Sequence, residues 1–335
     1  MESLTLPGHP QLPWTQPGWQ ENIQSWIDQK LTSRGIRIEG PLEILHMRTW
    51  SAFASIPTSD GIVYFKSPSS ENAFEAALTQ KLVQLQPDCM VKLLAVDLER
   101  GWTLSADSGD TLRSHIRSVD DLPKWDRVLP FYAEFQIDLA QNLNDLLFTG
   151  APDRRLELFP HLYRELLEDT ENLRVDNPPG LSSEEHRHLL KLQSEVEDMC
   201  LQLGSYGLPE TICHEEVHDA NVILDGERVI FTDWADSCIG HPFFTMLVTI
   251  RSAAFRAGIE DDAPEMLHLR DIYLEPWSSI GSPTELREAF DIAYRLAMIN
   301  RSLSYHLSMA RLPEEYKIEN DAIPGWLQDF LETFN

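Results

Sequence analysis

The sequence predicts an α+β protein of two unequal lobes, a small antiparallel β lobe followed by a larger and mostly helical one. Two observations carry this prediction. Short runs rich in β-branched and aromatic residues cluster between residues 41 and 106. After Asp110 the apolar residues recur instead at helical spacing. We therefore expect an N-terminal extension with a helix (1–40), a β-rich lobe (41–106) and a helical lobe (107–335).

The β lobe is predicted from five strand-like runs and one helix. Three runs come first, separated by Thr49–Ser51 and by a turn signal at Pro57–Gly61: LEILHMR, AFASI and GIVYFK. Residues 71–85 then carry apolar side chains at helical spacing, and two more runs follow: VKLLAVDL and GWTLSA. Upstream of all of them, helical spacing predicts a helix in the N-terminal extension from four apolar residues: Ile23, Trp26, Ile27 and Leu31.

The larger lobe is predicted from longer amphipathic segments. One apolar stripe is expected to run along a single long helix: Val128, Phe131, Phe135, Leu139, Leu143 and Leu146. Further helical patterns cover residues 156–167, 183–203, 242–257 and 285–311. One interruption breaks this series, where VIL and RVIFT flank the turn pair Asp225–Gly226. Such a pattern predicts a β-hairpin inside the helical lobe.

Charge and composition exclude several classes of partner. The 335 residues carry a formal net charge of -27 at pH 7, which repels phosphate backbones and anionic lipids. We expect neither a nucleic-acid nor a membrane partner, and two explanations stay open: a cationic substrate, or acidity that serves solubility alone. The longest apolar stretch, FFTMLVTI, is far shorter than the ~20 residues of a membrane span. No basic region followed by an apolar run opens the chain, so a cytoplasmic protein is expected.

The letters HEEVH, residues 214–218, match the HExxH pattern of zinc proteases. In those enzymes the two histidines lie one turn apart on a long helix. Here the pattern runs directly into the predicted hairpin, and no third histidine follows at the HxxGxxH spacing. We therefore predict a loop and no zinc site. The four cysteines also lie far apart without a CxxC pair, which indicates reduced thiols.

A different frame accounts for the same letters. His214 is followed by Glu216, Asn221 and, beyond the hairpin, by Asp233. This resembles the HxDxxxxN loop and the downstream metal-binding Asp of the aminoglycoside phosphotransferase and choline kinase family, relatives of the protein kinases. PDRRL from Pro152, DWADSCIGHPFF and LEPW resemble one branch of that family. The resemblance spans nearly the whole chain and implies a bilobal, protein-kinase-like fold.

The resemblance also implies a nucleotide site between the lobes. ATP, or GTP, would bind with Mg²⁺, and Asn221 and Asp233 would hold the metal through oxygen ligands. Lys66 would contact the α and β phosphates, oriented by Glu75 from the following helix. The remaining nucleotide contacts would come from Ser51 at the first turn of the β lobe, which has no glycine-rich loop, and from the interlobe hinge: Ser105, Ala106 and Asp107.

The same resemblance assigns the chemistry to Glu216 together with Lys66. Glu216 stands where the family has its catalytic Asp, and the neighbouring Glu215 stands where a small Gly is usual. A carboxylate base there would orient the acceptor hydroxyl, and Glu215 would add negative charge for a second cation or a substrate amino group. The predicted function is phosphoryl transfer from ATP to a hydroxyl of a small, potentially cationic molecule. The alternative is a catalytically impaired nucleotide-binding regulator or scaffold; neither the acceptor nor an oligomeric state is indicated.

Overall fold

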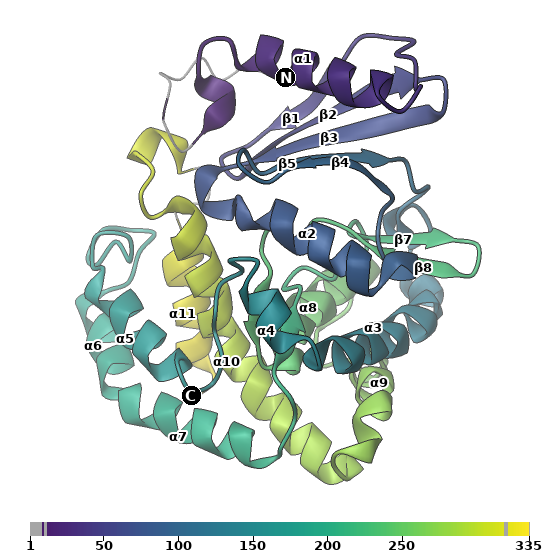
Figure 1. Cartoon of the computed structure of the whole chain (residues 1–335). Coiled ribbons are helices and arrows are strands. Elements are labelled where there is room, and N and C mark those ends of the chain that lie inside the picture. The colour runs from purple at the N-terminus through teal and green to yellow at the C-terminus, as the bar shows by residue number, and fades with distance from the viewer. Residues whose placement is uncertain (1–8, 10–11, 318–320, 335) are drawn as a thin grey trace.

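The computed structural model describes residues 9, 12–317 and 321–334. A small lobe, at the top of Figure 1, is built on one antiparallel sheet of five strands in the order β1-β2-β3-β5-β4. Its strands are β1 (Glu43–Met47), β2 (Ser51–Thr58), β3 (Gly61–Pro68), β4 (Leu93–Asp97) and β5 (Trp102–Ala106). Helix α1 (Trp19–Thr32) lies on one side of the sheet and α2 (Phe74–Leu85) on the other.

The strands of the small lobe present alternate residues to opposite faces, as a pleated strand must. One set packs under α1: Ala52, Ala54, Ile56, Val63, Phe65, Trp102 and Leu104. The buried face of α1 supplies the predicted apolar residues Ile23, Trp26, Ile27 and Leu31, together with Trp19. Because this face is sealed by α1, the intervening residues of β2, β3 and β5 turn toward the larger lobe.

The larger lobe is mostly helical and also contains two small strand pairs, one of which projects at the right-hand edge of Figure 1. The helices are α3 (Trp125–Ala140), α4 (Leu143–Leu147), α5 (Phe159–Glu168), α6 (Ser183–Lys191), α7 (Gln193–Ser205), α8 (Met246–Ala257), α9 (Pro264–Leu274), α10 (Pro283–Met309) and α11 (Ala322–Glu332). One strand pair is the predicted hairpin of β7 (Val222–Asp225) and β8 (Arg228–Phe231). The other pair, β6 (Thr211–Cys213) with β9 (Cys238–Gly240), was not predicted.

Short 3₁₀ helices lie before or between the main elements of the described chain: Pro13–Thr15, Ser70–Asn72, Pro87–Cys89, Leu112–Ser114, Val119–Lys124, Pro242–Thr245, Glu275–Ser279 and Glu314–Tyr316. Two of them shorten predicted helices, because α2 begins at Phe74 after the turn at Ser70–Asn72, and α8 begins at Met246 after the turn at Pro242–Thr245.

Two long helices predicted from the sequence are each divided in the structure. The stripe from Val128 to Leu146 continues across a break at Asn142, whose φ and ψ of -109° and 21° lie outside the helical region. Residues 183–203 form α6 and α7, which meet at Leu192 with φ and ψ of -81° and 2°. Apolar periodicity does not register such breaks, because the second helix presents its apolar side to the same core.

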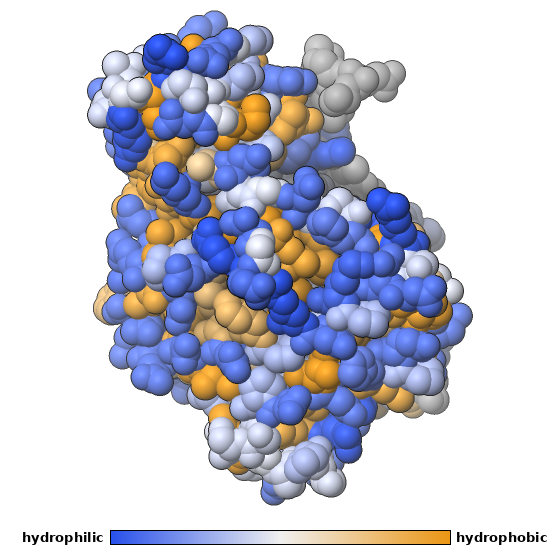
Figure 2. Space-filling view, turned by 90° about the vertical axis from the view of Figure 1, so that its right-hand side faces the viewer, coloured by the Kyte–Doolittle hydropathy of each residue, from blue (hydrophilic) through white to orange (hydrophobic). Residues whose placement is uncertain are grey.

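The core of the larger lobe is one continuous apolar cluster that includes Trp125, Trp234 and Trp277. All four cysteines are buried and free. The surface in Figure 2 is predominantly hydrophilic, with apolar residues gathered below the small lobe where it meets the larger one. Within the described residues, no helix combines the length and apolar character that crossing a bilayer demands.

Candidate nucleotide and phosphoryl-transfer site

The two lobes enclose a cavity of about 400 Å³. Its upper wall is the face of the sheet that α1 leaves free, and its lower wall includes Ile223 and Phe231 of the β7–β8 hairpin. Strand alternation explains which residues of the small lobe reach it. Lys66 faces the cavity, so Tyr64 two positions earlier does as well, and their partners across the sheet, Phe53 and Ser105, follow the same rule.

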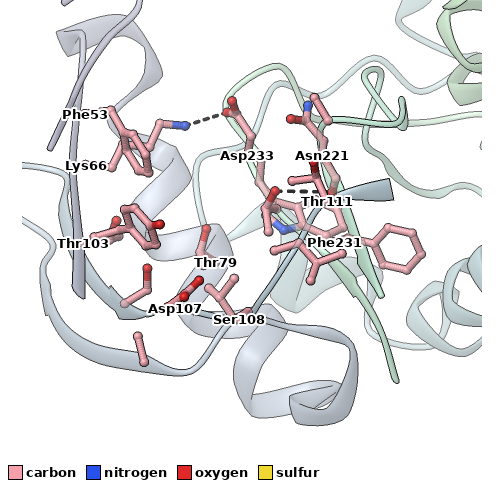
Figure 3. A pocket seen from close by; sticks show the side chains of 18 of the residues that line it. Phe53, Lys66, Thr79, Thr103, Asp107, Ser108, Thr111, Asn221, Phe231 and Asp233 are labelled. Carbon is pink, nitrogen blue, oxygen red and sulfur yellow. Dashed lines mark hydrogen bonds and ion pairs between the residues drawn. The ribbon is translucent and has the colours of Figure 1, made fainter. Parts of the chain in front are cut away.

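Lys66 forms two short ion pairs, one within the small lobe and one that crosses to the larger lobe. Its ammonium Nζ lies 2.6 Å from Glu75 Oε1 on α2 and 2.6 Å from Asp233 Oδ1 after β8. Figure 3 shows Lys66 reaching across the pocket to Asp233. Glu75 Oε1 also accepts a hydrogen bond from the Trp234 backbone N–H at 3.1 Å, so the small lobe is held against the residue next to Asp233.

Two carboxylates share the single positive charge of Lys66. Burial raises the pKa of Glu75 to about 7 against the opposing charge of Lys66. Burial also disfavours ionised Asp233, but the adjacent ammonium outweighs it and holds the pKa of Asp233 below its ordinary value. The two carboxylates together raise the pKa of Lys66 despite its burial. Two carboxylates thus compete for one ammonium, and Asp233 is the one with access to the cleft, since 46% of its side chain is exposed.

Asp233 has a left-handed backbone with φ of 64°. Few residues with a side chain adopt this region, although Asp and Asn do so more readily than most. The conformation turns the chain sharply after β8, next to Asn221, which precedes β7 at the other end of the hairpin pair. The hairpin thereby brings together two oxygen-bearing side chains that are twelve positions apart.

The segment HEEVH forms a loop between β6 and β7 and not a helix. A ring nitrogen of His214, Nε2, lies 2.7 Å from the Thr232 carbonyl, and the backbone N–H of His214 donates to the Tyr132 hydroxyl at 3.0 Å. Burial lowers the pKa of His214 to about 4, so the ring is a neutral structural group. No group of three or more His, Cys, Asp or Glu side chains with metal-binding geometry occurs in the described part of the chain.

Glu216 lies in this loop with its carboxylate anchored from α10. Arg301 donates from Nη2 to Glu216 Oε1 at 2.8 Å, and Arg301 is itself almost fully buried. The Glu216 side chain remains 25% exposed. The Asn221 side-chain amide donates to the Glu216 carbonyl at 3.2 Å, which ties the loop to the proposed metal ligand. Burial, and then the charge of Glu216, raises the pKa of the nearby Asp236.

The expectation that Glu215 offers its charge to a ligand is wrong. Its side chain is 1% exposed and points into the protein, where Arg154 Nη1 donates to Oε1 at 2.8 Å. Ser304 donates to the other oxygen at 2.7 Å, so both oxygens have partners from the protein itself. Glu215 is therefore a buried structural group that connects the loop to α10 and to the PDRRL segment.

Asn221 and Asp233 also fit the group that the resemblance assigns to them. Each presents a hard oxygen ligand of the type that Mg²⁺ prefers, and both line the cavity. The Asn221 side-chain nitrogen is occupied by the Glu216 carbonyl, which leaves its oxygen as the group available to a cation.

The structure gathers eight of the nine residues singled out from the sequence around one cavity: Ser51, Lys66, Glu75, Ser105, Ala106, Asp107, Asn221 and Asp233. The ninth, Glu216, lies in the adjoining loop outside that lining. Sequence reasoning missed the aromatic wall of Phe53 and Tyr64 and the anchoring arginines Arg154 and Arg301. Because side chains alternate between the two faces of a strand, Tyr64, two positions before Lys66 in β3, could have been predicted to face the cavity. No sequence signal pointed to Arg301, which is 85 positions from Glu216.

A small sheet lobe, a helical lobe and a lysine that pairs with two carboxylates in the cleft between them define the class of kinase-like phosphotransferases. A family comparison agrees: the chain belongs to the phosphotransferase enzyme family (APH), whose model matches residues 65–272. No curated protein matched the chain.

Solved structures share this fold at low sequence identity. A choline/ethanolamine kinase family protein from Mesorhizobium loti has a TM-score of 0.58 and 17% identity, with 89% of each chain covered. An ethanolamine kinase from Plasmodium vivax has a TM-score of 0.58 and 14% identity over 90% of this chain and 84% of that one. A choline kinase from Streptococcus pneumoniae has a TM-score of 0.58 and 14% identity over 93% and 98% of the two chains.

Proposed function

We propose that this protein transfers the γ-phosphoryl group of a purine nucleoside triphosphate, ATP or GTP, to a hydroxyl of a small molecule, with Mg²⁺ as cofactor. The observation that carries the proposal is the set of contacts of Lys66 with Glu75 and Asp233, 2.6 Å each, inside a cavity that Asn221 also lines. The family membership supports the reaction class.

The charges of the cleft complement a metal-bound nucleotide. The Lys66 ammonium suits a phosphate oxygen, and Glu75 keeps it in place when that phosphate arrives. Asp233 and Asn221 would hold Mg²⁺, which supplies neutralisation of the phosphate charge. Ser51 lies at the start of β2 and lines the same cavity, within the turn where the family resemblance places a phosphate contact.

Glu216 is the residue that we propose orients the acceptor hydroxyl. Phosphoryl transfer passes through a loose transition state, so the base is needed more to position the hydroxyl than to remove its proton early. The longer side chain of Glu, compared with Asp, would place the carboxylate roughly 1 Å away from its usual position, and such a shift can cost on the order of 100-fold in rate. Arg301 fixes the carboxylate by a charged hydrogen bond of 2.8 Å, which removes the freedom that the extra methylene adds.

The neighbouring structures include kinases named for choline and ethanolamine, both amino alcohols. We propose a small hydroxylated acceptor of this general kind, and the acidity of the chain is compatible with a positive charge on it. Asp236 lies close enough to Glu216 for the two charges to interact, so a second carboxyl group is present near the proposed acceptor position.

Thermal unfolding with nucleotide and metal tests the proposal. A ligand that binds only the folded state at 100 times its Kd stabilises it by about 2.7 kcal/mol, so millimolar MgATP or MgGTP should raise Tm by several degrees. Asp233→Asn should abolish the part of the shift that depends on Mg²⁺. The matched control is Asp225→Asn in the exposed β7–β8 turn, which should leave the shift unchanged.

A wild-type protein that shows no shift with either nucleotide would contradict the proposal. Turnover is then measured as nucleotide consumption against a panel of amino alcohols, aminoglycosides and sugars. Nucleotide binding without consumption on any acceptor in the panel would favour the regulator over the enzyme.

A further inference from the structure

The hinge end of the cavity carries a charged side chain that the phosphoryl-transfer chemistry does not use. Asp107 follows β5 directly and lines the cavity together with Ser108. Figure 3 shows both residues at the end of the pocket that lies away from Lys66 and Asp233. A nucleotide whose phosphates meet Lys66 would therefore place its base beside Asp107.

The carboxylate of Asp107 is fixed but not neutralised. Its Oδ1 accepts a hydrogen bond from the Gly109 N–H at 3.1 Å, which holds the side chain in place. None of the ion pairs among the described residues involves Asp107. Burial, and then the charge of Asp107, raises the pKa of Tyr64 on the upper wall, so this charge is felt inside the cavity.

Most backbone donors of the hinge are already occupied. The Ala106 N–H donates to the Lys92 carbonyl at 2.9 Å, and the Asp107 N–H donates to the Ile62 carbonyl at 3.0 Å. The Gly109 N–H is bound by Asp107 itself. Of the amides from Ala106 to Gly109, only that of Ser108 makes no hydrogen bond within the described residues. Within the described chain the hinge thus offers one free N–H donor, that of Ser108, and its acceptors include the two carboxylate oxygens of Asp107 in addition to backbone carbonyls.

The walls between Lys66 and the hinge suit a flat ring. Tyr64, whose partner across the sheet is Ser105 on the hinge side, stacks on Phe53, whose partner is Lys66, with centroids 5.3 Å apart and an interplanar angle of 8°. Ile223 and Phe231 line the lower wall. These apolar surfaces accept either purine, so discrimination between bases falls to the polar groups at the edge.

Guanine has the edge that matches the hinge. Its O6 accepts a hydrogen bond, while N1–H and the 2-amino group are adjacent donors. Adenine offers one donor at its 6-amino group and one acceptor at N1, and has no second donor for a carboxylate. Resting on the proposed function, we propose that Asp107 selects the nucleotide base, so that GTP is the preferred phosphoryl donor: N1–H and the 2-amino group donate to Asp107, and O6 accepts from the Ser108 N–H.

One additional hydrogen bond to a charged group corresponds to a preference of roughly tenfold or more. Calorimetric titration with the magnesium diphosphates GDP, ADP and IDP measures this without turnover. We expect GDP to bind at least about tenfold more tightly than ADP, and IDP, which lacks the 2-amino group, to lose about tenfold relative to GDP.

Asp107→Asn replaces one carboxylate oxygen by an NH₂ group, which opposes the second donor of guanine and matches N1 of adenine. We expect it to lower GDP affinity by about tenfold or more and to leave ADP affinity equal or higher. Asp110→Asn is the matched control, because Asp110 belongs to the same loop, is exposed and does not line the cavity; its base preference should equal that of the wild type.

Equal affinity of the wild type for GDP and ADP would overturn this inference and leave the proposed function intact. The same holds if Asp107→Asn weakens both nucleotides equally, since Asp107 would then contact the ribose, which both nucleotides share. Absence of binding by all three diphosphates and by their triphosphates would overturn the proposed function itself.

Discussion

A substitution at Arg154 tests the buried ion pair that supports the HEEVH loop. Arg154 Nη1 donates to Glu215 Oε1, to the Asn300 carbonyl at 3.0 Å and to Ser304 Oγ at 2.6 Å. The Arg154 side chain is 5% exposed and that of Glu215 is 1% exposed. Arg154→Met keeps much of the side-chain volume but leaves the Glu215 carboxylate without its closest cation.

Breaking one partner of a buried ion pair costs about 3–5 kcal/mol, because the remaining charge stays desolvated. Arg301 Nη1, 3.6 Å from Glu215 Oε2, offers partial compensation. We therefore expect Arg154→Met to lower the free energy of unfolding by about 3 kcal/mol. Urea denaturation followed by circular dichroism measures it. The double variant Arg154→Met/Glu215→Gln should lose much less than the sum of the single changes, since no unpaired buried charge remains.

An exposed ion pair provides the control. Arg287 lies 2.8 Å from Asp271, with 49% and 38% of their side chains exposed. Arg287→Met should cost less than about 1 kcal/mol, because water screens such pairs. A loss below about 1 kcal/mol for Arg154→Met, or a double variant that loses the full sum, would refute the argument that Glu215 needs Arg154 as its counter-charge.

Three further outcomes concern Glu216, the HEEVH loop and His241, a fully buried histidine that precedes the turn at Pro242–Thr245. Glu216→Gln should leave nucleotide affinity nearly unchanged and lower turnover by ~100-fold or more; unchanged turnover would exclude Glu216 as the orienting base, and activity confined to Glu216→Asp would mark the natural protein as impaired. Burial lowers the pKa of His241 from 6.5 to about 3, so its neutral form stabilises the fold above pH 6.5 and this stabilisation fades as the pH falls below 6.5. By pH 5 the loss is about 2 kcal/mol, and His241→Asn should show a shallower decline in urea midpoint between pH 7 and 5; parallel declines would contradict this origin. Elemental analysis should find no stoichiometric zinc, and chelation followed by Mg²⁺ should preserve fold and activity; about one zinc per chain, lost with activity in His218→Ala, would restore the protease interpretation.

The sequence alone predicted the order of elements in the small lobe and eight of the residues that line the cleft, but not the β6–β9 strand pair. Period-two runs and helical stripes are local signals, because each depends on which face of one segment is buried. The order of three strands, a helix and two strands therefore followed from the sequence, as did the β7–β8 hairpin. Lys66, Asn221 and Asp233 were singled out through the family resemblance, and the fold places all three at one cavity. The break between α3 and α4 could not be predicted from such local signals, because the apolar stripe continues past Asn142 without a change in its period.

Only the tertiary structure decided what Glu215 and Glu216 do. The two residues are adjacent in the chain and chemically alike, and the sequence analysis predicted that both would act on a ligand. In the fold, one side chain turns inward to Arg154 and the other stays partly exposed, held by Arg301. The cations that make this distinction come from positions 61 and 85 residues away. Ion pairs of this kind depend on which helices meet in space, and they leave no periodic pattern in the sequence. Local sequence patterns therefore determine the helices and strands, whereas the partner of each buried charge is determined only when those elements pack together.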